Sequence, residues 1–342
     1  MRARYWIAGS ILIWGTVATS MAFLQTPTQF WIARFLLGVG EAGFAPGIVL
    51  YLNRWIPARA RAGAFAWPML SIPISIIIGG PLSGWLLSMT NPLGMPSWRW
   101  MFLAEGAPAL VLAVLALGYF RDGPAEAPWL TDQEKTWLQN DLDQDRKART
   151  ISQVARKAEV FASPRVWLAA AVWFCLLTSA YGIIFWLPQA LKQMSDLTPL
   201  EIGWLSAAPW VAIGAGMFCN SWASDRTGRR FWHVGVPAVF GAVMLATIPN
   251  LGFTPAAFVF LTLAGLGLGA AQGAFWAAPM TFLNGAAVTV GVTLINLTGS
   301  TGGLVAPPAI GQIREATGGF SAAVYAMAAL MALAAPLLAL IA

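Results

Sequence analysis

The chain has 342 residues, of which 58% are hydrophobic and 10% are charged. Soluble domains have roughly 45–50% apolar and about 25% charged residues, so this composition excludes an ordinary water-soluble protein. The net charge of +6 would suggest a nucleic-acid partner in a soluble chain, but here the lysines and arginines fall in short loops between long apolar segments. Because basic residues in such loops set orientation in a bilayer, we predict an all-α polytopic membrane protein that lies in lipid and binds no nucleic acid.

Apolar segments long enough to cross a bilayer as helices recur along the whole chain. The first follows Met-Arg-Ala-Arg, and we interpret it as a retained helix because its apolar run is longer than the core of a secretory signal. Four segments precede a polar stretch from Arg121 to Pro164, and six follow it. The predicted spans are residues 5–24, 28–52, 63–89, 98–120, 165–190, 200–222, 232–250, 254–279, 284–312 and 318–341.

Positive charge alternates between the loops, with sixteen of the 20 lysines and arginines on one side of these spans and three on the other. This asymmetry predicts that the central stretch and the C-terminus are cytoplasmic, in a bacterial-type inner membrane. Within the central stretch, Thr131 and Glu134 have the spacing of a capping box at a helix start. Trp137, Leu138 and Leu142 then give that helix a partly apolar face, which suits either the membrane surface or a solvated linker.

The second span contains two charged residues, Arg34 and Glu41. Seven residues apart on a helix, they lie on nearly the same face, about 10 Å apart along the axis. An arginine in hydrocarbon costs on the order of 2.5–3.5 kcal/mol, so the pair requires a polar or wet environment. A structural ion pair within the helix is one explanation, and a charged site along a solute path is the one that we favour.

The sequence offers little for catalysis or metal binding. No nucleophile–base pair, phosphate loop or metal-ligand cluster is recognisable, so we predict no enzyme, no catalytic residue and no metal site. Cys175 and Cys219 lie in apolar segments, as small buried residues do. His233, the only histidine, stands at a helix start beside basic residues and is interpreted as interfacial.

A short cytoplasmic turn in the second half of the chain carries one acidic and three basic residues. Their charges can form bonds to a neighbouring helix end that break and reform, as in a latch, or can simply anchor the loop by the positive-inside rule. These two interpretations remain equal on charge alone. The residues of this predicted cytoplasmic gate are Asp225, Arg226, Arg229 and Arg230.

The same turn resembles the cytoplasmic loop signature of the major facilitator superfamily, Gly-x-x-x-Asp-Arg-x-Gly-Arg-Arg. Ser221 stands where the family usually has glycine, which predicts looser helix packing there. Four further segments resemble the anion:cation symporter branch, which includes phthalate, tartrate and hexuronate permeases. They are Arg-Phe-Leu-Leu-Gly-Val-Gly-Glu-Ala-Gly-Phe-Ala-Pro from Arg34, Ser-Trp-Arg-Trp-Met-Phe-Leu-Ala-Glu-Gly from Ser97, Tyr-Gly-Ile-Ile-Phe-Trp-Leu-Pro from Tyr181, and Ile-Asn-Leu-Thr-Gly-Ser-Thr-Gly-Gly from Ile295.

The resemblance implies a major-facilitator fold with ten of the usual twelve transmembrane helices, four and then six. Residues 1–120 would form an incomplete N-terminal bundle of family helices 3–6, residues 121–164 the cytoplasmic central loop, and residues 165–342 a C-terminal bundle of family helices 7–12. The first two family helices would then be absent, because Arg2-Ala-Arg4 resembles the end of the loop that follows them. An upstream in-frame extension with two more apolar spans is therefore expected.

The resemblance also assigns roles to residues. Arg34 would contact the substrate carboxylate, Glu41 would carry the coupled proton, and Tyr181 would place an aromatic hydroxyl in the cavity. The amides Gln272 and Asn296 would bind substrate or, equally, form bonds between helices. Glu105, at the outer end of its helix, is expected to bond a neighbouring helix.

Together these features predict a secondary active transporter that takes up an organic carboxylate with protons by alternating access. A sugar acid, a dicarboxylate and an aromatic acid all remain possible substrates. The proton gradient would supply the energy, no cofactor would be needed, and the carrier would work as a monomer. The alternatives are a truncated, non-transporting remnant of such a carrier and a drug or metabolite exporter of the same fold.

Overall fold

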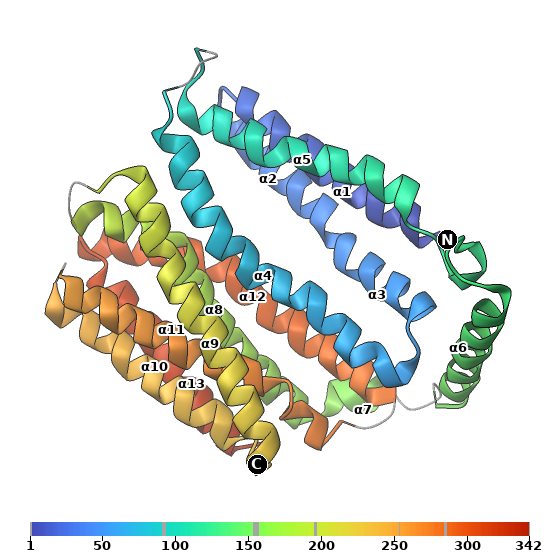
Figure 1. Ribbon diagram of the computed structural model, residues 1–342. Helices are drawn as coiled ribbons and strands as arrows, with labels where there is room; N and C mark the ends of the chain where they lie inside the picture. The colour runs from blue at the N-terminus through green and yellow to red at the C-terminus, as the bar shows by residue number, and fades with distance from the viewer. Residues whose placement is uncertain are drawn as a thin grey trace. The chain divides into compact units, whose positions relative to one another are not determined.

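The computed structural model describes residues 2–90, 94–152, 157–194, 197–252, 254–283 and 286–341, and all regular structure in these ranges is helical (Figure 1). Three short 3-10 turns accompany the α-helices, at Met21–Phe23, Pro124–Glu126 and Pro279–Thr281. The α-helices are α1 (Ala3–Ser20), α2 (Pro27–Ala42), α3 (Phe44–Trp55), α4 (Ala58–Ser88), α5 (Ser97–Tyr119), α6 (Asp132–Ser152), α7 (Lys157–Ala162), α8 (Pro164–Met194), α9 (Pro199–Thr227), α10 (Trp232–Leu251), α11 (Pro255–Phe275), α12 (Ala286–Thr317) and α13 (Ser321–Ala339).

Helices lie at each of the predicted spans, and the all-helical membrane fold is confirmed. Within the described residues, eight helices are long and apolar enough to cross a membrane. The helices α4 and α12 are not among the eight, so the count of ten spans stays a prediction. The short helix α7 was not predicted.

The chain divides into two compact units, one of Met1–Ile72 and Leu82–Ile151 and the other of Pro73–Pro81 and Ser152–Ala342. In the first unit, α1 packs along α5 and also contacts α2 and α3 (Figure 1). Ile7, Ile11, Ala109 and Ala113 form its buried core. Small residues let α1 and α5 approach closely, since a Cβ added at Gly106 would lie 2.7 Å from the Thr19 backbone nitrogen.

The second predicted span is divided by a turn at Gly43. Pro46 lacks the N–H that would bond the Ala42 carbonyl in a continuous helix, which explains the break. The Gly43 carbonyl accepts hydrogen bonds from the Gly47 backbone N–H at 3.1 Å and from the Trp6 indole at 2.6 Å. Because Arg34 and Glu41 both precede the turn, they still lie on one helix, as predicted.

In the second unit, α8 packs against α12 and α13, while α9 and α10 flank α11. Its core combines aromatic and branched side chains with many alanines. Large core residues include Trp173, Leu176, Ile213, Leu268, Phe275, Ile295 and Met331.

Glycines on two faces of α11 let both of its neighbours approach its backbone. Toward α10, a Cβ added at Gly267 would lie 2.8 Å from the Gly241 Cα. Three glycines spaced by four residues face α9, where an added Cβ would meet carbonyl oxygens of that helix: Gly265, Gly269 and Gly273. The helix α11 is therefore held tightly along the length that carries the predicted substrate-binding residue Gln272.

The looser packing expected at Ser221 is not what the structure shows. The Ser221 hydroxyl faces Gly273 of α11, 2.7 Å from the position that a Cβ would take there. The missing side chain at Gly273 makes room for this hydroxyl, so α9 and α11 remain in close contact.

The capping box predicted in the central stretch is confirmed at the start of α6. The Glu134 carboxylate accepts hydrogen bonds from the Thr131 backbone N–H at 2.8 Å and hydroxyl at 2.9 Å, and the Glu134 N–H donates to the Thr131 hydroxyl at 3.3 Å. On this helix Leu142 is buried, whereas Trp137 is 60% exposed. The choice between a membrane-surface helix and a solvated linker stays open.

Candidate functional site

Arg34 and Glu41 are both exposed on α2, whose first turn is fixed by a capping box between Thr26 and Gln29. The Arg34 guanidinium lies over the ring of Phe30, 5.2 Å from its centroid. Among the described residues no ion pair or hydrogen bond joins Arg34 to Glu41. The structural ion pair within the helix is therefore not formed, and the role of both charges in a solute path stays a prediction.

Trp6 fixes the backbone two residues beyond Glu41, through the hydrogen bond from its indole to Gly43. A Cβ added at Gly43 would lie 2.7 Å from the Ser10 hydroxyl, so only glycine lets α1 approach this closely. The sequence reasoning missed Trp6, because a membrane tryptophan is usually interpreted as an interfacial or packing residue. Its effect is to fix where α2 ends and hence where Glu41 lies.

An aromatic and amide cluster joins α8, α11 and α12 in the second unit. Trp173 of α8 stacks on Phe275 of α11, with ring centroids 4.8 Å apart, and meets Trp276 edge-on at 5.0 Å. The Trp173 indole N–H donates to the side-chain oxygen of Asn296 on α12 at 3.3 Å. The cluster thus joins three helices around one tryptophan that sequence reasoning did not select.

Gln272 lies one turn before Phe275 and Trp276, on the same face of α11. It is 8% exposed, and its Nε2 finds no hydrogen-bond partner in the described part of the chain. A buried amide donor without a partner costs roughly 1–3 kcal/mol. An oxygen atom bound at this amide would remove that cost, and the substrate-binding role of Gln272 stays a prediction.

The glycine-rich segment of α12 follows Asn296 and receives side chains from α8. A Cβ added at Gly299 would collide with the Trp173 ring, and one at Gly303 would lie 2.7 Å from the ring of Tyr181. Tyr181 is half-buried against this backbone, about two helical turns from Trp173 on α8. The structure therefore brings Gln272 and Asn296 to the Trp173 cluster but places Tyr181 farther along.

Of the predicted gate residues, Asp225 and Arg226 lie in the last turn of α9, and Arg229 and Arg230 follow it. Gly228 has φ +69°, and its N–H bonds the Ser224 carbonyl at 2.9 Å, which ends the helix in a left-handed turn. Asp225, Arg226 and Arg229 are exposed, and the Arg226 guanidinium lies 3.7 Å from the centroid of the Trp222 ring. No ion pair joins Asp225 to Arg226, Arg229 or Arg230 among the described residues.

A polar network beside this turn was not predicted. The Asn220 side-chain nitrogen donates to the carbonyls of His233 at 2.6 Å and Ala270 at 2.7 Å, which ties α9 to α10 and α11. The two His233 ring nitrogens lie 2.7 Å from the Asn220 side-chain oxygen and 2.7 Å from the Thr227 hydroxyl. His233 is thus part of a network that braces these helices, and its position at the membrane interface stays a prediction.

A second charged cluster joins the ends of α1, α3 and α5 in the first unit. The Asp122 carboxylate, only 8% exposed, lies 3.5 Å from the Arg4 side chain and 3.5 Å from that of Arg54. It also accepts the Arg4 backbone N–H at 3.1 Å. Sequence reasoning counted both arginines only as orientation signals and missed Asp122.

Glu105 has the structural role that was predicted for it. Its carboxylate accepts a hydrogen bond from the Ser83 hydroxyl of α4 at 2.6 Å.

The sequence model of the Major Facilitator Superfamily matches residues 1–307. The chain belongs to this superfamily. Its members are transporters and not enzymes, so the protein is a multi-pass membrane transporter. A protein from Agrobacterium vitis named as a tartrate transporter is 39% identical over 333 residues, which cover 97% of this chain and 74% of that protein.

Two further comparisons extend this result. A quinolone resistance transporter from Acinetobacter baumannii is 33% identical over 329 residues, which cover 96% of this chain and 75% of that protein. The crystal structure of a bacterial homolog of the human lysosomal transporter Spinster, inward-facing and unoccupied, aligns with a TM-score of 0.78 at 16% identity. That alignment covers 100% of this chain and 83% of the solved one, and it supports the major-facilitator fold.

Proposed function

We propose that this major-facilitator transporter takes up a small organic carboxylate together with protons by alternating access. The observation that carries the proposal is that α2 presents Arg34 and Glu41 within an apolar span without pairing them. Charges in such a segment are costly unless they act on a solute or an ion. The relative named as a tartrate transporter supports a carboxylate as the solute.

Each candidate residue then has a distinct chemical task. The Arg34 guanidinium is a planar fork of N–H donors that matches the two oxygens of a carboxylate, and Phe30 supports it from one side. Gln272 would donate its unpartnered N–H to a substrate oxygen, which satisfies the buried amide. The amide of Asn296 would bind a hydroxyl group of the substrate, or its oxygen would remain the acceptor for the Trp173 indole N–H.

Glu41 would carry the proton. A neutral Glu41 leaves one net positive charge on α2, which favours binding of an anion at Arg34. Loss of the proton places a negative charge about 10 Å along α2 from Arg34, where the carboxylate would bind, and favours release of that carboxylate. Proton binding and anion binding would thereby support each other without a cofactor, with the proton gradient as the source of energy.

Uptake into proteoliposomes tests this proposal. Purified protein would be reconstituted and given labelled tartrate, glucuronate or phthalate under an imposed pH gradient, which covers a dicarboxylate, a sugar acid and an aromatic acid. Uptake of at least one acid is expected. Arg34→Ala should lower it about tenfold or more, and Arg34→Lys should lower it less because the charge remains.

Arg165→Ala is the matched control, since Arg165 is exposed at the start of α8 and forms no ion pair with another described residue. It should transport like the wild type. No uptake of any acid by correctly folded wild-type protein would overturn the proposal and favour the alternative of a non-transporting remnant. Equal losses in Arg34→Ala and Arg165→Ala would remove Arg34 from the binding site.

A drug exporter is the second candidate, because one relative is named as a quinolone resistance transporter. Cells that express the protein would be loaded with a fluorescent quinolone and followed for efflux. Faster efflux with the wild type than with Arg34→Ala would favour export of the drug. Unchanged efflux, together with carboxylate uptake in proteoliposomes, would favour the import of metabolites.

We further propose that the protein lies in the inner membrane and works as a monomer. The central stretch and the C-terminus are expected on the cytoplasmic side, which reporter fusions at both positions would test. Light scattering of the detergent-solubilised protein would give the mass of the particle after subtraction of the detergent. A particle of one chain is expected, and a stable dimer would contradict this part of the proposal.

A further inference from the structure

A cavity of about 450 Å³ lies within the second unit, away from the Trp173 cluster. It is formed by the last turns of α8, α10 and α12, the first turns of α11 and α13, and the turn between α12 and α13. In the described part of the chain, Gln272, Asn296 and Tyr181 do not line it. The cavity is therefore separate from the candidate substrate-binding residues of this unit.

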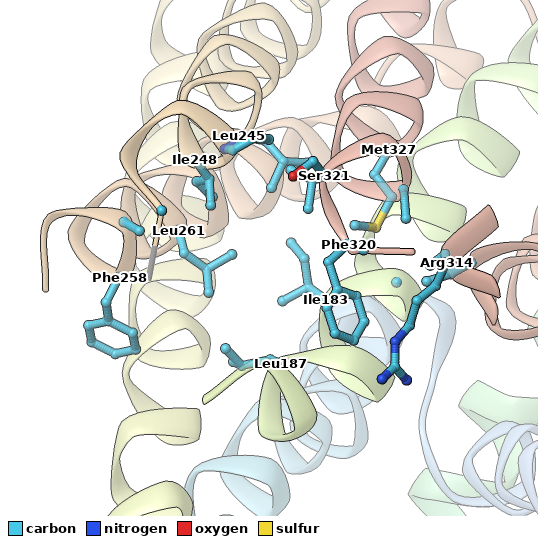
Figure 2. Close-up of a pocket in the computed structure, with 18 of the residues that line it drawn as sticks. Ile183, Leu187, Leu245, Ile248, Phe258, Leu261, Arg314, Phe320, Ser321 and Met327 are labelled. Atoms are coloured by element: carbon cyan, nitrogen blue, oxygen red, sulfur yellow. The ribbon is translucent and has the colours of Figure 1, made fainter. Parts of the chain in front are cut away.

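The walls of this cavity are apolar. Figure 2 shows Ile183, Leu187 and Leu261 directed toward one space, with Phe258 at its edge. Its volume falls within the range of roughly 300–1,000 Å³ that is usual for small-molecule sites.

Among the described residues that line the cavity, Arg314 is the cationic one. Arg314 lines the cavity from the last turn of α12, and its guanidinium lies over the ring of Phe320, 4.6 Å from the centroid (Figure 2). The helix ends at Gly318, whose φ of +72° lets the chain turn back to place Phe320 there. The cavity thus combines a long apolar lining with a fixed positive charge.

The position of Arg314 also runs against the charge pattern of the chain. The cavity lies at the end of α10 opposite the Asp225–Arg230 turn, and the loop charges predict that this end faces outward. Only three lysines and arginines fall on the predicted outer side, and Arg314 is one of them. The orientation of the protein in the membrane therefore does not account for Arg314.

We propose that this cavity binds the acyl chain of an anionic amphiphile, with the carboxylate or phosphate of that molecule at Arg314. A bilayer supplies such molecules at high local concentration, as fatty acids or as acidic phospholipids. The apolar walls would gain about 25 cal/mol for each Å² removed from water, and the guanidinium would select an anionic headgroup over a neutral one. The site does not depend on which solute the protein transports.

Fluorescence of a dansyl-labelled undecanoic acid on the purified full chain tests the proposal. Binding of the probe should be competed by oleate, by phosphatidylglycerol or by both, and far less by oleyl alcohol or phosphatidylcholine. Competition by oleate alone would identify a free acid, and competition by phosphatidylglycerol alone would identify a lipid headgroup. No specific binding of the probe would overturn the proposal.

Variants then separate the charge from the apolar space. Arg314→Gln should lower the affinity for the anionic probe about tenfold. Arg165→Gln, which changes an exposed arginine of α8, should bind the probe like the wild type. Leu261→Trp and Ile248→Trp each fill part of the cavity and should displace the probe, with thermal unfolding as the check on folding. An arginine that serves only the end of α12 would leave the affinity of Arg314→Gln unchanged, and that result would refute the assignment.

Discussion

Gly269→Ala tests whether the close contact of α9 and α11 positions the substrate-binding face of α11. A Cβ at Gly269 would lie 2.6 Å from the Ile213 Cα and 2.7 Å from its carbonyl carbon, and would also collide with the carbonyl oxygen. These are backbone atoms, so the helices must separate by roughly 1 Å. A gap of that size forfeits up to about half of each van der Waals contact across it.

We expect Gly269→Ala to lower the free energy of unfolding by about 2 kcal/mol, within the usual range for overpacking. Gly214→Ala is the matched control, because a Cβ at Gly214 on α9 meets no atom within 4 Å. That variant should be neutral or more stable by up to about 1 kcal/mol, since alanine favours the helix over glycine.

Thermal unfolding in detergent, followed by tryptophan fluorescence, would measure both changes. In proteoliposomes Gly269→Ala should also raise the KM for the carboxylate, because Gln272 is only three residues farther along α11. Equal stability of Gly269→Ala and Gly214→Ala would refute the packing argument. A destabilised Gly269→Ala with an unchanged KM would refute the link to Gln272.

Three other perturbations follow from contacts that the structure reveals. Asp122→Asn should lower the free energy of unfolding by about 2 kcal/mol, because Arg4 and Arg54 lose the charge that compensates them. Thermal unfolding would measure this loss against Glu315→Gln, a control at an exposed site. Equal stability of the two variants would contradict the stabilising role of the Asp122 cluster. Trp6→Phe should lower the free energy of unfolding by about 1 kcal/mol, because it removes the hydrogen bond to the Gly43 carbonyl. It should also shift the pH profile of uptake, because the backbone near Glu41 is then less firmly held. An unchanged pH profile would show that Trp6 has no part in proton coupling. The hydrogen bonds from the Thr131 backbone and hydroxyl lower the pKa of Glu134, so they stabilise the start of α6 fully above the ordinary pKa of the carboxyl and are lost as the pH falls through its lowered value. Hydrogen-exchange protection of that turn, corrected for intrinsic rates, should therefore fall in acid for the wild type but not for Glu134→Gln, and a protection independent of pH in the wild type would refute the assignment.

Much of the fold could be predicted from sequence because the bilayer imposes long apolar helices with polar loops. The cap at Thr131 and the charges Arg34 and Glu41 were also recognisable, since their signals lie within one helical segment. The break at Gly43 was not predicted, although Pro46 carries the signal for it. Proline is tolerated in membrane helices, so Pro46 alone does not predict a break there. The hydrogen bond from the Trp6 indole to the Gly43 carbonyl, which marks the turn, depends on a contact between helices.

Each residue that the sequence analysis missed has a partner that is distant along the chain. Asp122 meets Arg4 across 118 residues, and Asn220 reaches Ala270 across 50 residues. Trp173 joins Asn296 across 123 residues, so its role in the candidate site has no local signature. Such contacts depend on which helices become neighbours, which hydropathy and charge patterns leave undetermined.

The central claim is that Glu41 couples protons to carboxylate movement while Arg34 binds the carboxylate. The most direct measurement follows labelled tartrate and internal pH together in proteoliposomes, for the wild type, Glu41→Gln and the control Glu315→Gln. Glu41→Gln should exchange labelled for unlabelled tartrate but neither accumulate it against a gradient nor acidify the interior, whereas Glu315→Gln should behave like the wild type. Proton-driven accumulation by Glu41→Gln at the wild-type level would contradict the account.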